Sequence, residues 1–269
     1  MESILIGTSG YSYNDWVGPV YPVGTPVKDY LSVYSTLFPF TELNFTYYRQ
    51  PNPHTIERMT HVVGDRFCFS VKAHQSLTHT KDADLHKEAA VFKQGISPLI
   101  EASQLAVVLF QFPFSFHYTP QSRRHLERVC GAFEGLPVVI EFRNGEWMRE
   151  SVYAGLKKRE VGLVNVDEPD LPGLIRPGSV VTADLGYVRF HGRNSKNWWS
   201  GDNVSRYDYL YSEDELAQWI PRIRKMMERC RVVMIAFNNH SKGQAVQNAR
   251  MLKALIDRNL SSVENGGGT

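Results

Sequence analysis

The sequence predicts an α/β fold of the (β/α)8 TIM-barrel class, folded as a single domain. Two observations carry this prediction: eight short runs rich in Ile, Val and Phe recur along the chain, and longer segments with helical spacing separate them. Strands and helices that alternate with right-handed crossovers form a parallel sheet. Eight such strands favour a closed barrel over an open sheet, and α/β barrels often reach the length of this chain as one domain.

The predicted strands are apolar runs, and several are apolar on both faces, as in strands covered by helices. They are Ile4–Thr8, Phe40–Phe45, Phe67–Ala73, Leu105–Phe112, Val138–Phe142, Val161–Val166, Tyr187–His191 and Val232–Phe237. A doubly wound sheet would place a GxGxxG loop after its first strand. The residues there, Gly7–Tyr13, do not have that spacing, which again favours the barrel.

Four apolar stripes predict helices within residues 27–38, 126–133, 216–230 and 245–256. Thr119 before Pro120 has the pattern of an N-cap followed by proline in the first turn. Ser212 and Glu215 have the spacing of a capping box. Glu168–Asp184 contains three prolines and little helical pattern, so we expect the sixth helix to be short or missing.

The chain shows no domain boundary. We expect one barrel domain over residues 1–260 and a disordered, Gly-rich tail over residues 261–269. One long connection, His191–Tyr211, is both polar and aromatic, and its length is typical of a functional loop or lid.

The composition excludes several classes of protein. With 42% hydrophobic and 22% charged residues, the chain is neither disordered, collagen-like nor a coiled coil. Its net charge of +2 means that any anion binding must come from local placement of cations. No apolar run has the length of a membrane span, no signal-peptide pattern is visible, and the three cysteines form no CxxC pair. We therefore expect a cytoplasmic protein with no membrane partner and no obligate protein partner.

Polar residues follow the apolar runs at the points where the strands should end. In chain order they are Ser9, Glu42, Asn44, Lys72, His74, Gln111, Glu141, Arg143, Asp167, Arg189, His191, Arg193, Asn238 and Asn239. The active sites of TIM barrels lie at the carboxyl ends of the strands. The set therefore predicts a functional site, although a barrel interior can also bury a paired, purely structural group of charges.

Several motifs resemble those of a known family. They are Gly7-Thr8-Ser9-Gly10-Tyr11-Ser12-Tyr13 with Trp16, Glu42-Leu43-Asn44-Phe45-Thr46-Tyr47-Tyr48-Arg49, Phe69-Ser70-Val71-Lys72-Ala73, Gln111-Phe112-Pro113, Glu141-Phe142-Arg143 with Trp147, Tyr187-Val188-Arg189-Phe190-His191-Gly192-Arg193, and Phe237-Asn238-Asn239. Taken together, they resemble the YecE-like domain-of-unknown-function family (DUF seventy-two) over nearly the whole chain. The resemblance implies a TIM barrel and brings no established activity.

Three possible metal ligands occur at successive strand ends. They are Glu141, Asp167 and His191, in an order similar to part of the metal set of xylose isomerase-like and endonuclease IV-like barrels. The eighth strand, however, offers Asn238 where those barrels have a carboxylate. Arg143 and Arg189, two residues from the possible ligands, would repel a cation. We therefore predict no bound metal and no cofactor.

Anion binding agrees better with the same residues. The predicted substrate-binding residues are the cations Lys72, Arg143, Arg189 and Arg193 with His79, the polar residues Asn44, Gln111, Asp167, Asn238 and Asn239, and the aromatic residues Tyr47, Trp147 and Tyr209, with Trp198 and Trp199 as further stacking candidates. Arginine binds phosphate and carboxylate through two hydrogen bonds. Aromatic rings can stack on a sugar or base.

The resulting hypothesis is an enzyme that acts on a phosphate- or carboxylate-bearing substrate, including a phosphodiester. Glu42 or Glu141 would act as general base and His191 as general acid. We expect an anion to contact Arg189 and at least one of the other cations. Two alternatives stay open: a nucleic-acid-binding protein without catalysis, and a glycosidase-like, sugar-binding barrel with Glu42 and Glu141 as its carboxylate pair.

Overall fold

The strands close into one parallel barrel in the computed structural model, which describes residues 4–80 and 83–264. In chain order they are β1 (Ile4–Ser9), β2 (Phe40–Leu43), β3 (Cys68–Lys72), β4 (Leu105–Gln111), β5 (Val138–Glu141), β6 (Gly162–Asp167), β7 (Leu185–Phe190) and β8 (Val232–Phe237). Each strand pairs with the next, and β8 pairs with β1. The predicted (β/α)8 barrel is confirmed, and every strand overlaps a predicted apolar run.

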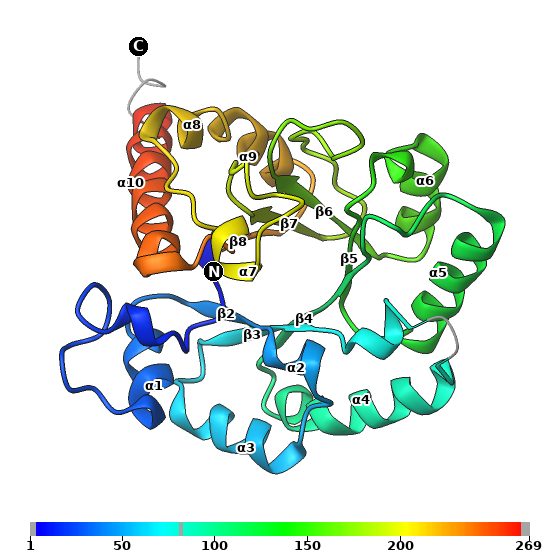
Figure 1. Cartoon of the computed structure of the whole chain (residues 1–269), viewed down its shortest axis with the longest axis horizontal. Helices are drawn as coiled ribbons and strands as arrows, with labels where there is room; N and C mark the ends of the chain where they lie inside the picture. The colour runs from blue at the N-terminus through cyan, green and yellow to red at the C-terminus, as the bar shows by residue number, and fades with distance from the viewer. Residues whose placement is uncertain (1–3, 81–82, 265–269) are drawn as a thin grey trace.

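Helices surround the barrel, as Figure 1 shows. They are α1 (Tyr30–Ser35), α3 (Pro53–Val62), α4 (Leu85–Glu101), α5 (Pro120–Ala132), α6 (Glu150–Lys158), α8 (Glu213–Ala217), α9 (Ile220–Met227) and α10 (Gln244–Glu264). Two short helices, α2 (Phe45–Tyr48) and α7 (Asn203–Arg206), lie over the centre of the molecule in that view. Both follow strand ends, so they belong to the side where a barrel holds its site.

The predicted helix starts are observed. The Thr119 side chain accepts a hydrogen bond from the Ser122 backbone N–H, and Ser212 with Glu215 forms a full capping box. The stripe at 216–230 divides into α8 and α9, because Pro221 occupies the first turn of a new helix. α10 extends to Glu264 and so includes the first four residues of the predicted tail; residues 265–269 lie outside the described residues.

Residues 168–184 contain no helix, as predicted. Instead this segment binds β6 through hydrogen bonds of side chains. The Asn165 amide bonds the N–H and the carbonyl of Val180, and the Thr182 hydroxyl accepts from the Leu163 N–H. These bonds replace the cover that a crossover helix would give and satisfy buried backbone groups.

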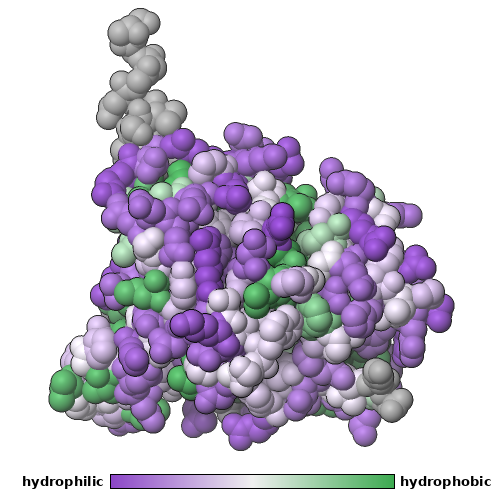
Figure 2. Space-filling view, turned by 45° about the horizontal axis from the view of Figure 1, so that its top comes forward, coloured by the Kyte–Doolittle hydropathy of each residue, from purple (hydrophilic) through white to green (hydrophobic). Residues whose placement is uncertain are grey.

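Side-chain alternation along β7 decides what reaches the barrel interior. Tyr187 and Arg189 face inward, where both contact Glu42, whereas Phe190 packs outward against Tyr211 and Trp219. Hydrophilic residues dominate the face drawn in Figure 2, and its hydrophobic residues form small separate patches. None of the described helices combines the length and apolar character needed to cross a bilayer.

Candidate active site

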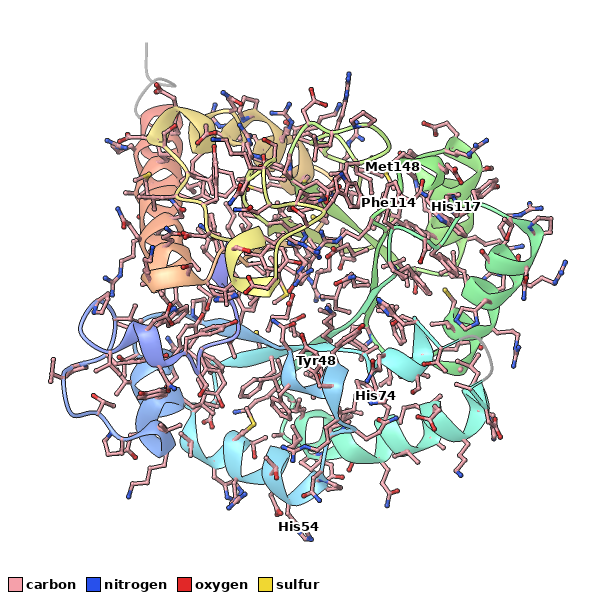
Figure 3. All side chains as sticks on the ribbon, in the orientation of Figure 1. Tyr48, His54, His74, Phe114, His117 and Met148 are labelled. Atoms are coloured by element: carbon pink, nitrogen blue, oxygen red, sulfur yellow. The ribbon has the colours of Figure 1, made fainter. Side chains whose placement is uncertain are left out.

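A cavity of about 790 Å³ opens at the carboxyl ends of the strands. Its volume is in the range of small-molecule sites. The predicted site residues that line it are Glu42, Asn44, Tyr47, Lys72, His79, Gln111, Arg143, Arg189 and Asn238. Tyr48 and Phe114, which also line it, lie toward the centre of the view in Figure 3, whereas His54 lies at the outer edge. Strand ends that are far apart in sequence therefore contribute to one cavity.

The floor of the cavity is a buried ion-pair network centred on Arg189. Its guanidinium Nη2 donates to Glu42 Oε1 at 2.6 Å, and its Nη1 donates to Glu141 Oε2 at 2.5 Å. Tyr187 Oη adds a hydrogen bond of 3.1 Å to the second oxygen of Glu42. Arg189 is 1% exposed and both glutamates are fully buried, so each charge depends on its partner.

Glu141 binds a second arginine. Its Oε1 accepts from Arg143 Nε at 2.5 Å and lies 3.2 Å from His191 Nε2, without the alignment of a hydrogen bond. Burial alone would raise the pKa of Glu141, but Arg189 and Arg143 outweigh burial and hold it well below the usual value. Glu141 is therefore a fully ionised, neutralised carboxylate, which makes it a weak proton acceptor.

His191 is held as a neutral imidazole. Its Nδ1 faces Arg143 Nη2 at 3.3 Å and the side-chain nitrogen of Asn238 at 3.1 Å. Arg143 can only donate, so Nδ1 acts as acceptor and the ring proton is assigned to Nε2, toward Glu141. Burial, with the Arg143 charge, lowers the pKa of His191 to about 3. His191 lies behind the lining residues and orients Arg143 and Asn238.

Arg143 also contacts a carboxyl group outside the predicted set. Its Nη1 lies 3.3 Å from Glu168 Oε2, and the other Glu168 oxygen accepts from the Ile175 N–H at 2.9 Å. Burial raises the pKa of Glu168 to about 7, although Arg143 acts in the opposite direction. The helix-free segment after β6 therefore supplies a third carboxyl group to this network.

Lys72 differs from the two arginines because no carboxylate of the described residues lies within ion-pair distance of it. Its Nζ donates to Gln111 Oε1 at 2.7 Å and lies 4.4 Å from the centre of the Tyr47 ring. The Lys72 side chain is half-buried at the cavity floor. Burial and the neighbouring Arg189 charge lower the pKa of Lys72 to about 7.

The connection predicted as a functional loop covers one side of the cavity. It contributes Trp198, Trp199, Arg206 and Tyr207 to the lining. Trp198 is buried 5.7 Å from the Arg143 guanidinium, and Trp199 is 53% exposed against Phe114. The sequence identified this loop but did not single out Arg206 or Tyr207. Their signal was their position between Trp199 and Tyr209 in the same loop.

The structure places Asp167 and Arg193 beside the cavity, outside its lining. Arg193 Nε and Nη2 bind Asp167 at 2.8 and 2.7 Å, and Arg193 also lies 3.3 Å from Glu215. We expected Arg193 to follow Arg189 toward the mouth, which required an extended chain. Gly192 has φ 86°, in the left-handed region, and this turn redirects Arg193.

Asp167 anchors this second cluster, which also includes a predicted aromatic residue. Besides Arg193, Asp167 accepts from Tyr211 Oη at 2.8 Å and from Trp219 Nε1 at 2.7 Å. Tyr209 donates to Glu215 at 2.5 Å and does not line the cavity. The cluster therefore fastens the loop to β6 and α8.

Two other predicted binding residues hold the scaffold. Trp147 is 1% exposed, stacks on Phe116 and Phe142, and donates from Nε1 to the Phe116 carbonyl. Asn239 is fully buried and donates to the Tyr209 carbonyl and to Asn248. Neither side chain is placed to stack on or bond a ligand in the cavity.

The two carboxylates of the possible metal set, Asp167 and Glu141, are already bound by other side chains. Asp167 is occupied by Arg193, Tyr211 and Trp219, whereas Glu141 is occupied by two arginines. Over residues 4–80 and 83–264, no group of three or more His, Cys, Asp or Glu side chains is arranged to hold a metal ion. These side chains therefore do not fit the metal set of the xylose isomerase-like and endonuclease IV-like barrels.

Comparison with known proteins gives one consistent result. The model of the family described as "Protein of unknown function DUF72" matches residues 5–266. The UPF0759 protein YunF of Bacillus subtilis is 30% identical, over 97% of both chains. The crystal structure of a DUF72 family protein from Thermotoga maritima is 37% identical, with a TM-score of 0.89 over 95% of this chain and 100% of that one. One from Enterococcus faecalis is 27% identical, with a TM-score of 0.83 over 94% and 95%.

Proposed function

The chain belongs to the DUF72 family, and we propose from the cavity's own residues that it is an enzyme acting on a phosphate- or carboxylate-bearing small molecule. The ligand would bind at the carboxyl ends of the strands, where characterised TIM-barrel enzymes hold their substrates. The observation that carries the proposal is the presence of two basic side chains in the lining, Lys72 and Arg206, that have no described carboxylate within ion-pair distance.

The balance of charges distinguishes these cations from the others. Arg189 binds Glu42 and Glu141, and Arg143 binds Glu141 and lies near Glu168, so both arginines already have carboxylate partners. Arg206 donates only a long hydrogen bond of 3.5 Å to the Gly201 carbonyl, and its Nε is buried without a partner among the described atoms. A buried donor without a partner is costly, and an anion would satisfy it.

The rest of the lining favours a ligand with a ring or hydroxyl groups. Tyr47, Trp198 and Tyr207 supply aromatic surface. The side-chain oxygen of Asn44 is buried without a donor among the described atoms, and a ligand hydroxyl or amine would satisfy it. Glu42 and Glu141 then act as positioning groups that hold Arg189 and Arg143. We assign the proton transfers to Lys72 and Glu168, whose pKa values are shifted to about 7.

A binding screen tests the proposal. Calorimetric titrations with inorganic phosphate and with phosphate- and carboxylate-bearing metabolites should find ligands that bind the wild type. Arg206→Ala should weaken that binding by about 1.5–3 kcal/mol, the effect of a lost charged hydrogen bond. The matched control is Arg258→Ala, which removes an exposed arginine from α10, paired with Glu213. If no anion binds, or if both variants bind equally, the proposal is wrong.

Binding of single-stranded nucleic acid is a second candidate, favoured by two exposed rings at the rim. Trp199 is 53% and Tyr48 is 63% exposed, and both line the cavity. Such rings can stack on bases. An oligonucleotide that binds far more tightly than a mononucleotide, with an affinity that decreases steeply with salt, would support this candidate. Equal affinity for the two would reject it.

A further inference from the structure

We propose that the amine of Lys72 is a covalent nucleophile that forms an imine with the carbonyl group of an aldehyde or ketone bound in the cavity. This inference rests on the proposed anionic substrate and narrows it to a molecule that carries both a carbonyl and an anionic group. It goes beyond the role of Lys72 as a point charge for anion binding.

The position of the amine makes attack on a ligand possible. Lys72 is the last residue of β3, and it lines the cavity. Its hydrogen bond to Gln111 Oε1, at 2.7 Å, orients the amine. The carboxylate Glu141 on the cavity floor pairs with Arg143 and Arg189 and not with Lys72. A lysine held in an ion pair keeps its proton, whereas this one can lose it to become a nucleophile.

The surroundings favour the neutral amine. The charged and titratable groups that act on Lys72 or face it from the neighbouring elements are Arg189 of β7, Arg143 after β5, Glu141 of β5, Glu42 of β2, Tyr47 of α2 and His79 after β3. Both glutamates already bind arginine. Desolvation and the Arg189 charge oppose protonation of Lys72 and lower its pKa to about 7. A lysine next to a second cation is a known way to activate an amine.

The chemical step is balanced without an oxidant or a metal. The neutral Nζ adds to the carbonyl carbon, and the C–N bond forms as the carbonyl π bond breaks. The carbinolamine then loses its oxygen as water, and both hydrogens of that water come from the amine. The product is a C=N bond to Lys72, and a proton from solvent makes it the cationic imine.

Reductive trapping tests the inference. The probes are glyceraldehyde 3-phosphate and its neutral counterpart glyceraldehyde, each with cyanoborohydride, and peptide mass spectrometry locates the modified lysines. At about pH 7.5 the neutral fraction of Lys72 exceeds that of an ordinary lysine by several hundred-fold, roughly. We expect Lys72 to be modified at least about tenfold faster than the exposed Lys28 and Lys253, because a lower pKa also reduces nucleophilicity.

Matched variants separate this inference from the proposed function. Lys72→Arg and Lys72→Met should both lose the trapping at position 72, whereas phosphate binding is judged on the wild type and on Arg206→Ala. Modification of Lys72 no faster than the exposed lysines, with either probe, would overturn the imine even if phosphate binds. Equal modification by both probes, unaffected by added inorganic phosphate, would support the nucleophile and contradict the anion site. An unchanged thermal unfolding midpoint of Lys72→Arg shows that this variant is folded.

Discussion

Two cations on the same cavity floor, Arg189 and Lys72, have opposite relations to their neighbours. Arg189 binds the carboxylates of Glu42 and Glu141, and Tyr187 donates to Glu42, so its charge is matched although its Nε has no described partner. Lys72 has one neutral acceptor, Gln111, and an aromatic ring. The difference teaches that a charged residue at a strand end is not by itself a ligand site. Charged residues that are buried in ion pairs stabilise the barrel. Basic residues of the cavity without a carboxylate partner are available to a substrate.

The largest expected effect is on stability at Arg189. Arg189→Ala leaves Glu42 and Glu141 buried with fewer partners, so we expect a loss of about 3–5 kcal/mol in the free energy of unfolding. Arg206→Ala, at the rim, should change it by no more than about 0.5 kcal/mol. Urea unfolding of both variants measures this contrast. Equal stability of the two would show that the Arg189 network is dispensable.

A second prediction concerns the pH dependence of stability. The pKa of Lys72 is lowered to about 7 in the folded protein, so between about pH 7 and 10 the unfolded state binds more protons at this position. The free energy of unfolding of the wild type relative to Lys72→Met should therefore rise with pH across this window. The slope should be at most about 1.4 kcal/mol per pH unit, lowered by solvent in the cavity. Chemical unfolding at several pH values measures it, and a flat difference would show an ordinary lysine.

The smallest expected effect is at the rim. Trp199→Ala should weaken the binding of a ring-bearing anionic ligand by about 1 kcal/mol. It should leave the binding of inorganic phosphate unchanged, because only a ring can stack on Trp199. Stability should change little, because Trp199 is half exposed. Competition titrations with the two ligand types measure the difference. A similar loss for both ligands would mean that Trp199 acts by shaping the loop.

The fold was readable from the sequence because strand and helix patterns are local. Each apolar run became a strand, and Thr119 and Ser212 capped helices as expected. The cavity followed from the same logic, since strand ends of a closed barrel must meet. The missing sixth helix was also readable, because prolines and weak periodicity are local signals.

The sequence did not predict which groups the charged residues bind. Whether Arg189 binds a ligand or Glu42 depends on contacts between strands far apart in sequence. The prediction for Arg193 was wrong because Gly192, in the left-handed region, turns the chain before it. Trp147 has the same side chain whether it stacks on a ligand or on Phe142. The catalytic roles first suggested for Glu42, Glu141 and His191 stay predictions, and the geometry favours positioning roles for all three.

The central claim is that Lys72 has no carboxylate partner and therefore loses its proton near neutral pH, and sulfate binding tests it most directly. Sulfate keeps its charge between about pH 6 and 8.5, and His79 and His191, with pKa values lowered to about 4 and about 3, stay neutral there. The account predicts that the calorimetric affinity of the wild type decreases over this range. Glu168, whose pKa is raised to about 7, also gains charge here, so the part of the decrease that is absent in Lys72→Arg, which stays charged, is the part due to Lys72. Identical pH profiles for the two proteins would contradict it.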